Sequence, residues 1–265
     1  MPKLILVTVG TSALDKCCEV HSGSIEKLAD DLHRKGETSR FYTDVKKDTL
    51  KNLKNNTNLS CRGLIGYSRF SAEIASLLAM HKDPSIGKIT TEDKIILLHS
   101  DTVAGKLCAE VNAEVICETL MGCPDRISEV KESEDGKAVV TIFRPSSDSP
   151  EIIQMIRLVG LQPKNAGDFV EKGLTNLFER TKNLLESHYN EWRRFVNITG
   201  GYKGEIPIQT LQAELKNVPI VYLFEYAELV KMTFTDDGVK LWVGNQSAPA
   251  ATIPIHRREE EIEKI

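Results

Sequence analysis

The chain has 265 residues and a formal net charge of −4. This length suits one large α/β domain, or one domain with an appendage. The acidic balance excludes a general binder of long nucleic acid, because such proteins usually carry a basic face and a domain pI above about 9. A small anionic ligand held by a few local cations remains compatible with it. No apolar run reaches the roughly 20 residues that span a membrane.

The six cysteines do not form a metal-binding pattern. No Cys-x-x-Cys pair is present, and no histidine cluster completes a zinc site. Cys108 and Cys117 lie in apolar runs and are predicted to be reduced core residues. Reduced thiols make the cytoplasm the simplest compartment. We therefore expect a cytoplasmic protein with no metal and no cofactor.

The first half of the chain alternates between apolar strands and helices. The continuous apolar run from Leu4 to Val9 is typical of a strand buried on both faces. Helices are predicted from Ser24 to Arg34 and from Ser71 to His81, since their apolar residues share one face. The Lys- and Asn-rich stretch from Thr43 to Cys61 is interpreted as a loop or an irregular insert.

A second buried strand is predicted from Lys94 to His99. It ends in Ser100-Asp101-Thr102, which can cap a helix from Val103 to Asn112. The short β-branched run from Glu114 to Cys117 is interpreted as a strand.

The second half is less regular. Residues 121–150 are charged and are interpreted as an inserted hairpin or meander. Asp168-x-x-Glu171 is typical of a capping box at the start of a long helix. The remaining predicted elements are a strand at 194–198, a helix from Glu205 to about Leu215, a strand from Val218 to Phe224, a hairpin from Met232 to Trp242 and a frayed charged helix from His256.

This alternation predicts the α/β class with a doubly wound, mostly parallel, Rossmann-like sheet. The expected organisation is one domain over residues 1–230, with an insertion at about 121–165. A short C-terminal hairpin and charged tail follow over residues 231–265. Ligands of such sheets bind beyond the carboxyl ends of the strands.

Three predicted strands end in small, hydroxyl or glycine residues. The three ends are Gly10-Thr11-Ser12, Ser100-Asp101-Thr102 and Thr199-Gly200-Gly201. Because parallel strands end at one edge of a sheet, we expect the three ends to meet there.

The loop after the strand at 194–198 has the features of an anion site. Gly200 and Gly201 let backbone amides approach an anion closely, since no Cβ intervenes. Lys203 adds a full positive charge beside a predicted helix N-terminus, where the helix dipole disfavours a cation. This placement favours an anion between the lysine and the helix.

Three motifs together resemble the CARF domains of type III CRISPR systems, as in the Csm6/Csx1 and APE2256-like groups. They are Val9-Gly10-Thr11-Ser12, the segment from Leu98 to Thr102, and the segment from Asn197 to Gly204 followed by 219–225. The resemblance covers roughly residues 1–230, and 121–165 match least clearly. It implies a homodimer that binds a cyclic oligoadenylate, most often the tetra-adenylate, across its twofold axis. Some members are ring nucleases that also cleave this messenger.

The candidate site residues follow from the motifs and the resemblance. Lys203 and Ser12 are the candidate catalytic residues of a slow, metal-independent cleavage to linear products ending in a 2′,3′-cyclic phosphate. The candidate ligand-binding residues are Gly10, Thr11, Ser12, Ser100, Asp101, Thr102, Asn197, Thr199, Gly200, Gly201 and Lys203. Helix capping explains Ser100, Asp101 and Thr102 nearly as well, and a structural role explains Asn197 better.

Two other functions remain open. Many relatives carry a C-terminal ribonuclease with an Arg-x(4–6)-His motif, and the nearest pair here, Arg180 and His188, is spaced too widely. The chain is therefore either a standalone CARF protein or a non-catalytic sensor that signals to a partner or to a further domain. A nucleotide-binding Rossmann enzyme is disfavoured, because Gly10 stands alone after the first strand where Gly-x-Gly-x-x-Gly would be expected.

Overall fold

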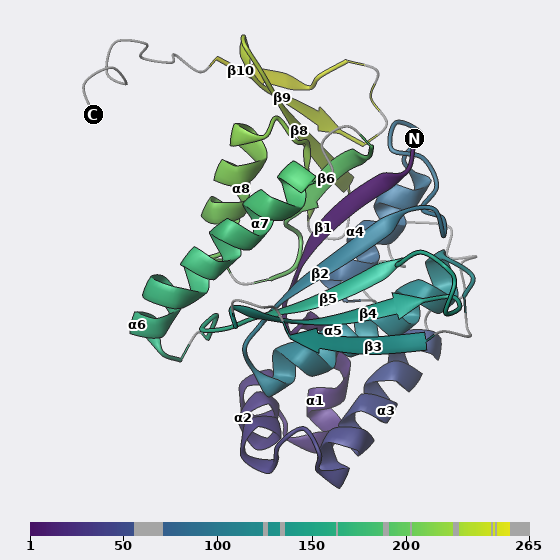
Figure 1. Ribbon diagram of the computed structural model, residues 1–265, viewed down its shortest axis with the longest axis vertical. Helices are drawn as coiled ribbons and strands as arrows, with labels where there is room; N and C mark the ends of the chain where they lie inside the picture. Colours follow the sequence, from purple (N-terminus) through teal and green to yellow (C-terminus); the bar gives the residue numbers. More distant parts are fainter. Residues whose placement is uncertain are drawn as a thin grey trace.

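A ten-stranded mixed sheet forms the centre of the protein (Figure 1). The computed structural model describes residues 1–55, 71–123, 127–132, 136–162, 164–187, 191–201, 203–224, 228–244, 246 and 248–254. The strands are β1 (Lys3–Val9), β2 (Lys94–Ser100), β3 (Ile127–Glu132), β4 (Ala138–Arg144), β5 (Ile153–Leu158), β6 (Arg193–Asn197), β7 (Ile220–Phe224), β8 (Glu228–Thr235), β9 (Gly238–Val243) and β10 (Ala251–Ile253). They lie in the order β10-β9-β8-β7-β6-β1-β2-β5-β4-β3.

The sheet is parallel only in its middle. The pairings from β7 through β6, β1 and β2 to β5 are parallel, whereas β8–β10 and β3–β4 add antiparallel strands at the two ends. The expectation of a mostly parallel sheet therefore holds for the core and is wrong for the flanks. The carboxyl ends of β1, β2 and β6 leave the same edge, as the parallel core requires.

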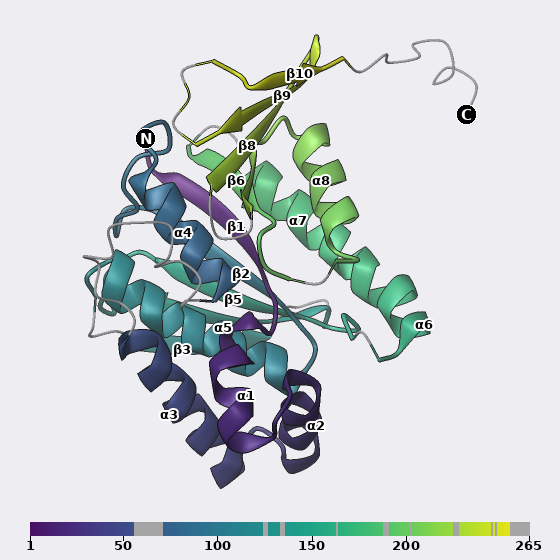
Figure 2. The same cartoon turned by 180° about the vertical axis from the view of Figure 1, so that it is seen from behind.

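Helices cover both faces of the sheet, as a doubly wound fold predicts (Figures 1 and 2). One face carries α1 (Asp15–His21), α2 (Ile25–Lys35), α3 (Arg40–Asn55), α4 (Ala72–Lys82) and α5 (Val103–Val115), which continues as a π-helical turn, Ile116–Leu120. The other carries α6 (Ala166–Asp168), a π-helical turn, Phe169–Leu174, then α7 (Thr175–Ser187) and α8 (Ile206–Leu215).

The central strand β1 contributes to two separate hydrophobic cores. All seven of its residues are buried. Ile5 and Val7 pack into the core beneath α1–α5, whereas Leu4 and Leu6 pack into the core beneath α7 and α8. Successive side chains of a strand point to opposite faces, so a continuous apolar run is the pattern for this position.

Three sequence-based assignments were wrong. The polar stretch from Thr43 is helix α3 as far as Asn55, because it buries a stripe of apolar and hydroxyl side chains; residues 56–61 lie outside the described part. The run from Glu114 to Cys117 continues helix α5 and is not a strand. Residues 153–158 form the parallel core strand β5, which the expectation of an insertion over 121–165 had overlooked.

Other elements match the expectation or shift slightly. Ser24, Ser71 and Thr102 cap α2, α4 and α5 through their side chains. The long helix begins at the N-cap Asn165, upstream of the expected capping box at Asp168. The predicted C-terminal hairpin is β8–β9, and it extends the main sheet by pairing with β7. The expected tail helix from His256 lies outside the described residues.

Within the described ranges, no helix has the length and apolarity to cross a membrane. The five cysteines that the structure describes are free thiols, and Cys61 lies outside it.

The start of β1 is fixed by a buried carboxylate from the turn before β2. Asp93 Oδ1 accepts a hydrogen bond from Lys3 N–H (2.7 Å), and Oδ2 accepts one from Thr90 N–H (2.8 Å). The Lys3 ammonium lies 3.0 Å from Asp93 Oδ2, and both side chains are buried. Removing one partner of a buried ion pair leaves the other charge without compensation.

We predict that Asp93→Ala lowers the free energy of unfolding by about 3–5 kcal/mol. The measurement is chemical denaturation at neutral pH. Its control is Glu92→Ala, which removes an exposed carboxylate one residue away and should change stability by less than about 0.5 kcal/mol. Equal stability of the two variants would contradict the assignment.

Candidate functional site

The loops after β1, β2 and β6 form what we call the strand-end rim. Strand β1 pairs with β2 on one side and with β6 on the other, both in parallel. The rim consists of Gly10–Ser12, Ser100–Thr102, Thr199–Gly201 and Lys203. The neighbouring strand ends that the sequence predicted to lie on one edge do so.

Two of the three loops are in backbone contact. A Cβ added to Gly10 would lie 3.1 Å from the Gly201 amide nitrogen, and one added to Gly200 would lie 2.6 Å from the Thr8 carbonyl oxygen. Gly201 has a φ of +87°, a conformation that side chains disfavour. Thr8 Oγ1 also donates a hydrogen bond to the Gly200 carbonyl (2.7 Å). The glycines therefore allow the β1 and β6 loops to approach closely.

A buried carboxylate that the sequence analysis missed lies beneath this contact. Glu73, the second residue of α4, has 0% of its surface exposed. Its Oε1 accepts a hydrogen bond from Gly10 N–H (2.7 Å), and its Oε2 accepts one from Ser12 Oγ (3.0 Å) and a longer one from Asn112 Nδ2 (3.4 Å). A Cβ on Gly200 would lie only 2.2 Å from Glu73 Oε1.

One signal in the sequence could have identified Glu73. It is the one charged residue between Ala72 and Met80, in a helix that is otherwise apolar or small. Carboxylates are almost never fully buried unless they are paired. An isolated acid in an apolar helix therefore indicates a specific set of donors, which here are Gly10 and Ser12 of the rim and Asn112 of α5.

Ser12 is the rim hydroxyl closest to this carboxylate. It opens a short 3₁₀ turn, Ser12–Leu14, and is partly exposed. Its Oγ donates to Glu73 and accepts a hydrogen bond from Ala72 N–H (3.0 Å), the first amide of α4. Thr11, the residue before it, is partly exposed and makes no side-chain capping bond.

Among the described residues, the loop after β2 is hydrogen-bonded to residues at and after the end of β5, and not to the loops after β1 and β6. Asp101 Oδ1 accepts from Arg157 Nε (2.6 Å), and Oδ2 accepts from Gly160 N–H (3.1 Å). Burial raises the pKa of Asp101, but the Gly160 amide and the Arg157 guanidinium outweigh it, so that the pKa lies below its ordinary value. Ser100 Oγ lies 2.8 Å from Thr102 Oγ1, which caps α5. These side chains hold the loop in place.

Asn197 and Thr199 also have internal partners. Asn197 is fully buried, and its Nδ2 donates to Ser76 Oγ (2.7 Å) while its Oδ1 accepts from Thr199 N–H (3.1 Å). Thr199 Oγ1 accepts from Leu223 N–H (2.9 Å). The structure thus places the Asn197 side chain inside the molecule, where it fixes the start of the Gly-Gly turn.

Lys203 is exposed and close to the Gly-Gly turn in the chain. Among the described residues no carboxylate forms an ion pair with it. Arg157, near the β2 loop, differs from Lys203 in this respect, because it pairs with Glu37 and Asp101. Lys203 is therefore available to an anion from solution.

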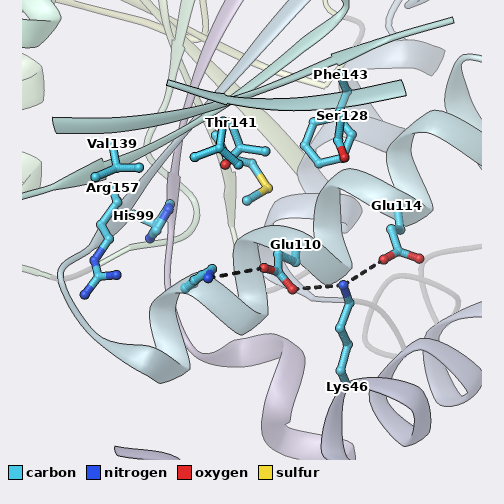
Figure 3. A pocket seen from close by; sticks show the side chains of 12 residues that line it. Lys46, His99, Glu110, Glu114, Ser128, Val139, Thr141, Phe143 and Arg157 are labelled. Atoms are coloured by element: carbon cyan, nitrogen blue, oxygen red, sulfur yellow. Dashed lines mark ion pairs between the residues drawn. The ribbon is translucent and has the colours of Figure 1, made fainter. Parts of the chain in front are cut away.

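A cavity of about 640 Å³ lies on the face of α3 and α5, under β3–β5 (Figure 3). Its lining comprises Lys46, His99, Lys106, Glu110, Glu114, Ser128, Val130, Val139, Thr141, Phe143, Met155 and Arg157. Lys46 pairs with Glu110 (2.8 Å) and Glu114 (3.0 Å), and Lys106 pairs with Glu37. Because carboxylates neutralise its cations, this cavity suits a polyanion less well than the rim does.

His99 lies between this cavity and the end of β2. Its ring is buried, and Nδ1 lies 3.0 Å from the Ser100 carbonyl oxygen, to which it donates as the neutral tautomer. Burial first, and then the nearby charges of Arg157 and Lys106, lower the pKa of His99 to about 4 despite that hydrogen bond. Among the described residues, no group of three or more His, Cys, Asp and Glu side chains is placed to hold a metal ion.

We predict that His99 makes folding sensitive to acid. The folded pKa of about 4 lies below the ordinary value of 6.5, so the unfolded chain binds the proton more readily. The free energy of unfolding therefore decreases as the pH is lowered from 6.5 toward 4. The measurement is the free energy of unfolding in urea at pH 7.0 and at pH 4.5. Between these two pH values His99→Asn, whose amide can replace the Nδ1 donor, should lose about 2.5 kcal/mol less of that free energy than the wild type. Equal losses would exclude a neutral buried His99.

The sequence was also compared with known proteins. No curated protein matches it. The model of a family described as CRISPR-associated protein (Cas_APE2256) matches residues 68–233, more than half of the chain. The matched segment includes Glu73, the β2 loop and the Gly-Gly turn with Lys203. The chain therefore belongs to the CRISPR-associated Cas_APE2256 family.

Proposed function

We propose that the protein binds a cyclic oligoadenylate, with cyclic tetra-adenylate as the first candidate, at the strand-end rim and cleaves it slowly without metal. The observation that carries the proposal is the close contact between the Gly10 loop and the Gly200-Gly201 turn, which Lys203 follows in the chain as an exposed lysine that no described carboxylate pairs with. Membership of a CRISPR-associated family supports this class of ligand, given the motifs shared with CARF domains.

The rim has the properties that a bridging phosphate needs. Glycine amides can approach an anion without a Cβ in the way, and Lys203 supplies a full charge two residues after Gly201 in the chain. The protein as a whole is acidic, with a net charge of −4. A local cation in an acidic protein favours a small anionic ring over a long nucleic acid.

Cleavage of such a ring requires little machinery. An RNA-like phosphodiester carries its own nucleophile, the 2′-hydroxyl, and Ser12 would orient it in line with the leaving 5′-oxygen. Positioning of this kind contributes at most about 7–11 kcal/mol. Lys203 and the glycine amides would stabilise the charge on the phosphoryl oxygens by about 3–4 kcal/mol. The products would be linear oligoadenylates ending in a 2′,3′-cyclic phosphate.

A homodimer would bring two rims to one ring. Helix α8, which begins three residues after Lys203, exposes Leu211 (43%) and Leu215 (61%) one turn apart on the same face. Exposed apolar side chains in one patch are typical of interaction surfaces. This face of α8 is therefore the surface that we propose for pairing of two copies.

The central experiment combines binding and product analysis. We predict that purified protein binds cyclic tetra-adenylate and converts it to linear product equally well with and without EDTA. Lys203→Ala should lower the cleavage rate about 100-fold or more, because it removes a charge that stabilises the transition state. Lys47→Ala, an exposed lysine on α3, is the control and should cleave at the wild-type rate.

Three other outcomes of this experiment would each favour a different function or mechanism. Tight binding without cleavage would leave a sensor that transmits messenger binding to a partner or to a further domain. Normal cleavage by Lys203→Ala would remove the lysine from the mechanism. Binding of NAD, with no binding of oligoadenylate, would favour a Rossmann-type nucleotide enzyme.

A further inference from the structure

We propose that Glu73 is a positioning residue that makes Ser12 the proton acceptor for the attacking hydroxyl. The inference rests on the proposed function, and it deepens it by supplying the base that the rim otherwise lacks. Its evidence is the direction of three hydrogen bonds at Ser12 and Glu73.

The hydroxyl of Ser12 can act toward a ligand only as an acceptor. It has one hydrogen and two lone pairs. The hydrogen points to Glu73 Oε2 (3.0 Å), because a carboxylate can only accept, and one lone pair receives Ala72 N–H (3.0 Å). One lone pair remains, on a residue that is partly exposed at the rim. It can receive a ribose 2′-hydroxyl, whereas a phosphate oxygen offers it no hydrogen.

The surroundings of Glu73 hold the carboxylate as an acceptor. It lies in the first turn of α4, where the helix dipole favours a negative charge. Gly10 N–H donates to Oε1, and Ser71 Oγ donates to Asn112 Oδ1 (2.7 Å), which turns the Asn112 amide nitrogen toward Glu73. In the part of the chain that the structure describes, no lysine or arginine forms an ion pair with Glu73. Neutral donors and the helix end therefore offset its charge.

In the proposed cleavage, each proton that leaves one group is accepted by another. As the 2′-oxygen forms its bond to phosphorus, its proton passes to Ser12 Oγ, and the Ser12 proton passes to Glu73 Oε2. The bond between phosphorus and the 5′-oxygen breaks, and the leaving oxygen takes a proton from water or from the Lys203 ammonium. After product release, Glu73 returns its proton through Ser12 to solvent. No water is consumed, so the product keeps its 2′,3′-cyclic phosphate.

Glu73→Gln tests this arrangement with almost no change in shape. Its amide oxygen can still accept from Gly10 N–H, but its NH₂ group would now donate to Ser12 Oγ. With Ala72 N–H and the new amide filling both lone pairs, Ser12 could only donate, and it would no longer accept the 2′-proton. The substitution thus reverses the hydrogen bond to Ser12, and it also removes the acceptor of the longer bond from Asn112 Nδ2.

We expect Glu73→Gln to bind cyclic tetra-adenylate within about threefold of the wild type and to cleave it about 100-fold or more slowly in single turnovers. Its log rate should rise with pH with a slope near one between pH 6 and 8, since hydroxide must replace the relay, whereas the wild-type profile is flatter. Glu73→Gln combined with Ser12→Ala should be no slower than Ser12→Ala alone, because both act on one step.

The matched control is Glu26→Gln. Glu26 is the second residue of α2, as Glu73 is of α4, but it is exposed. It should cleave at the wild-type rate with the wild-type pH profile. Thermal unfolding of each variant checks the fold. If Glu73→Gln does not fold, Ser12→Ala carries the test, and a slow rate with the wild-type pH profile would overturn the relay.

The outcomes separate the relay from the function on which it rests. Wild-type cleavage with an equally fast Glu73→Gln overturns the relay and leaves the proposed function standing. Wild-type binding without any cleavage reduces the function to sensing and removes the relay with it. A protein that neither binds nor cleaves cyclic tetra-adenylate overturns both.

Discussion

A single buried carboxylate, Glu73, fixes the β1 loop of the strand-end rim to helix α4. Glu73 accepts hydrogen bonds from the amide of Gly10 and the hydroxyl of Ser12, and it packs against the Cα of Gly200. Gly10 and Ser12 of the β1 loop and Asn112 of α5 therefore share one acceptor on α4, and Gly200 of the β6 loop packs beside it. A fully buried charge is tolerated only where donors surround it, so the β1 loop cannot move away from α4 without depriving that charge of two donors.

Much of the fold follows from local pattern. The runs at β1 and β2 are mostly apolar because helices cover both faces, and that signal does not depend on distant residues. Helix α3 was missed because its exposed face is rich in lysine and asparagine, which obscured a buried stripe of Tyr42, Val45, Thr49 and Leu53. Strand β5 was missed because a charged hairpin precedes it, and its parallel pairing with β2 depends on contacts far away in sequence.

The candidate site was also predictable in part from the sequence. The sequence predicted which strand ends would lie on one edge, because topology alone places them there. It did not predict how the polar groups are used: Asp101 is bonded to Arg157, Asn197 supports a turn, and Ser12 faces a glutamate 61 positions away. Which hydroxyl is free and which is engaged is decided by residues that no short motif contains.

The contact between Gly10 and the Gly-Gly turn is made by backbone against backbone. Such a contact has no rotamers to settle, so the backbone of the two loops is fixed in position without any ligand. Ordering of flexible groups is a large part of the free-energy cost of association, and a rigid receptor avoids most of it. A preorganised edge of this kind would lower the free-energy cost of binding for any small ligand that the rim accepts.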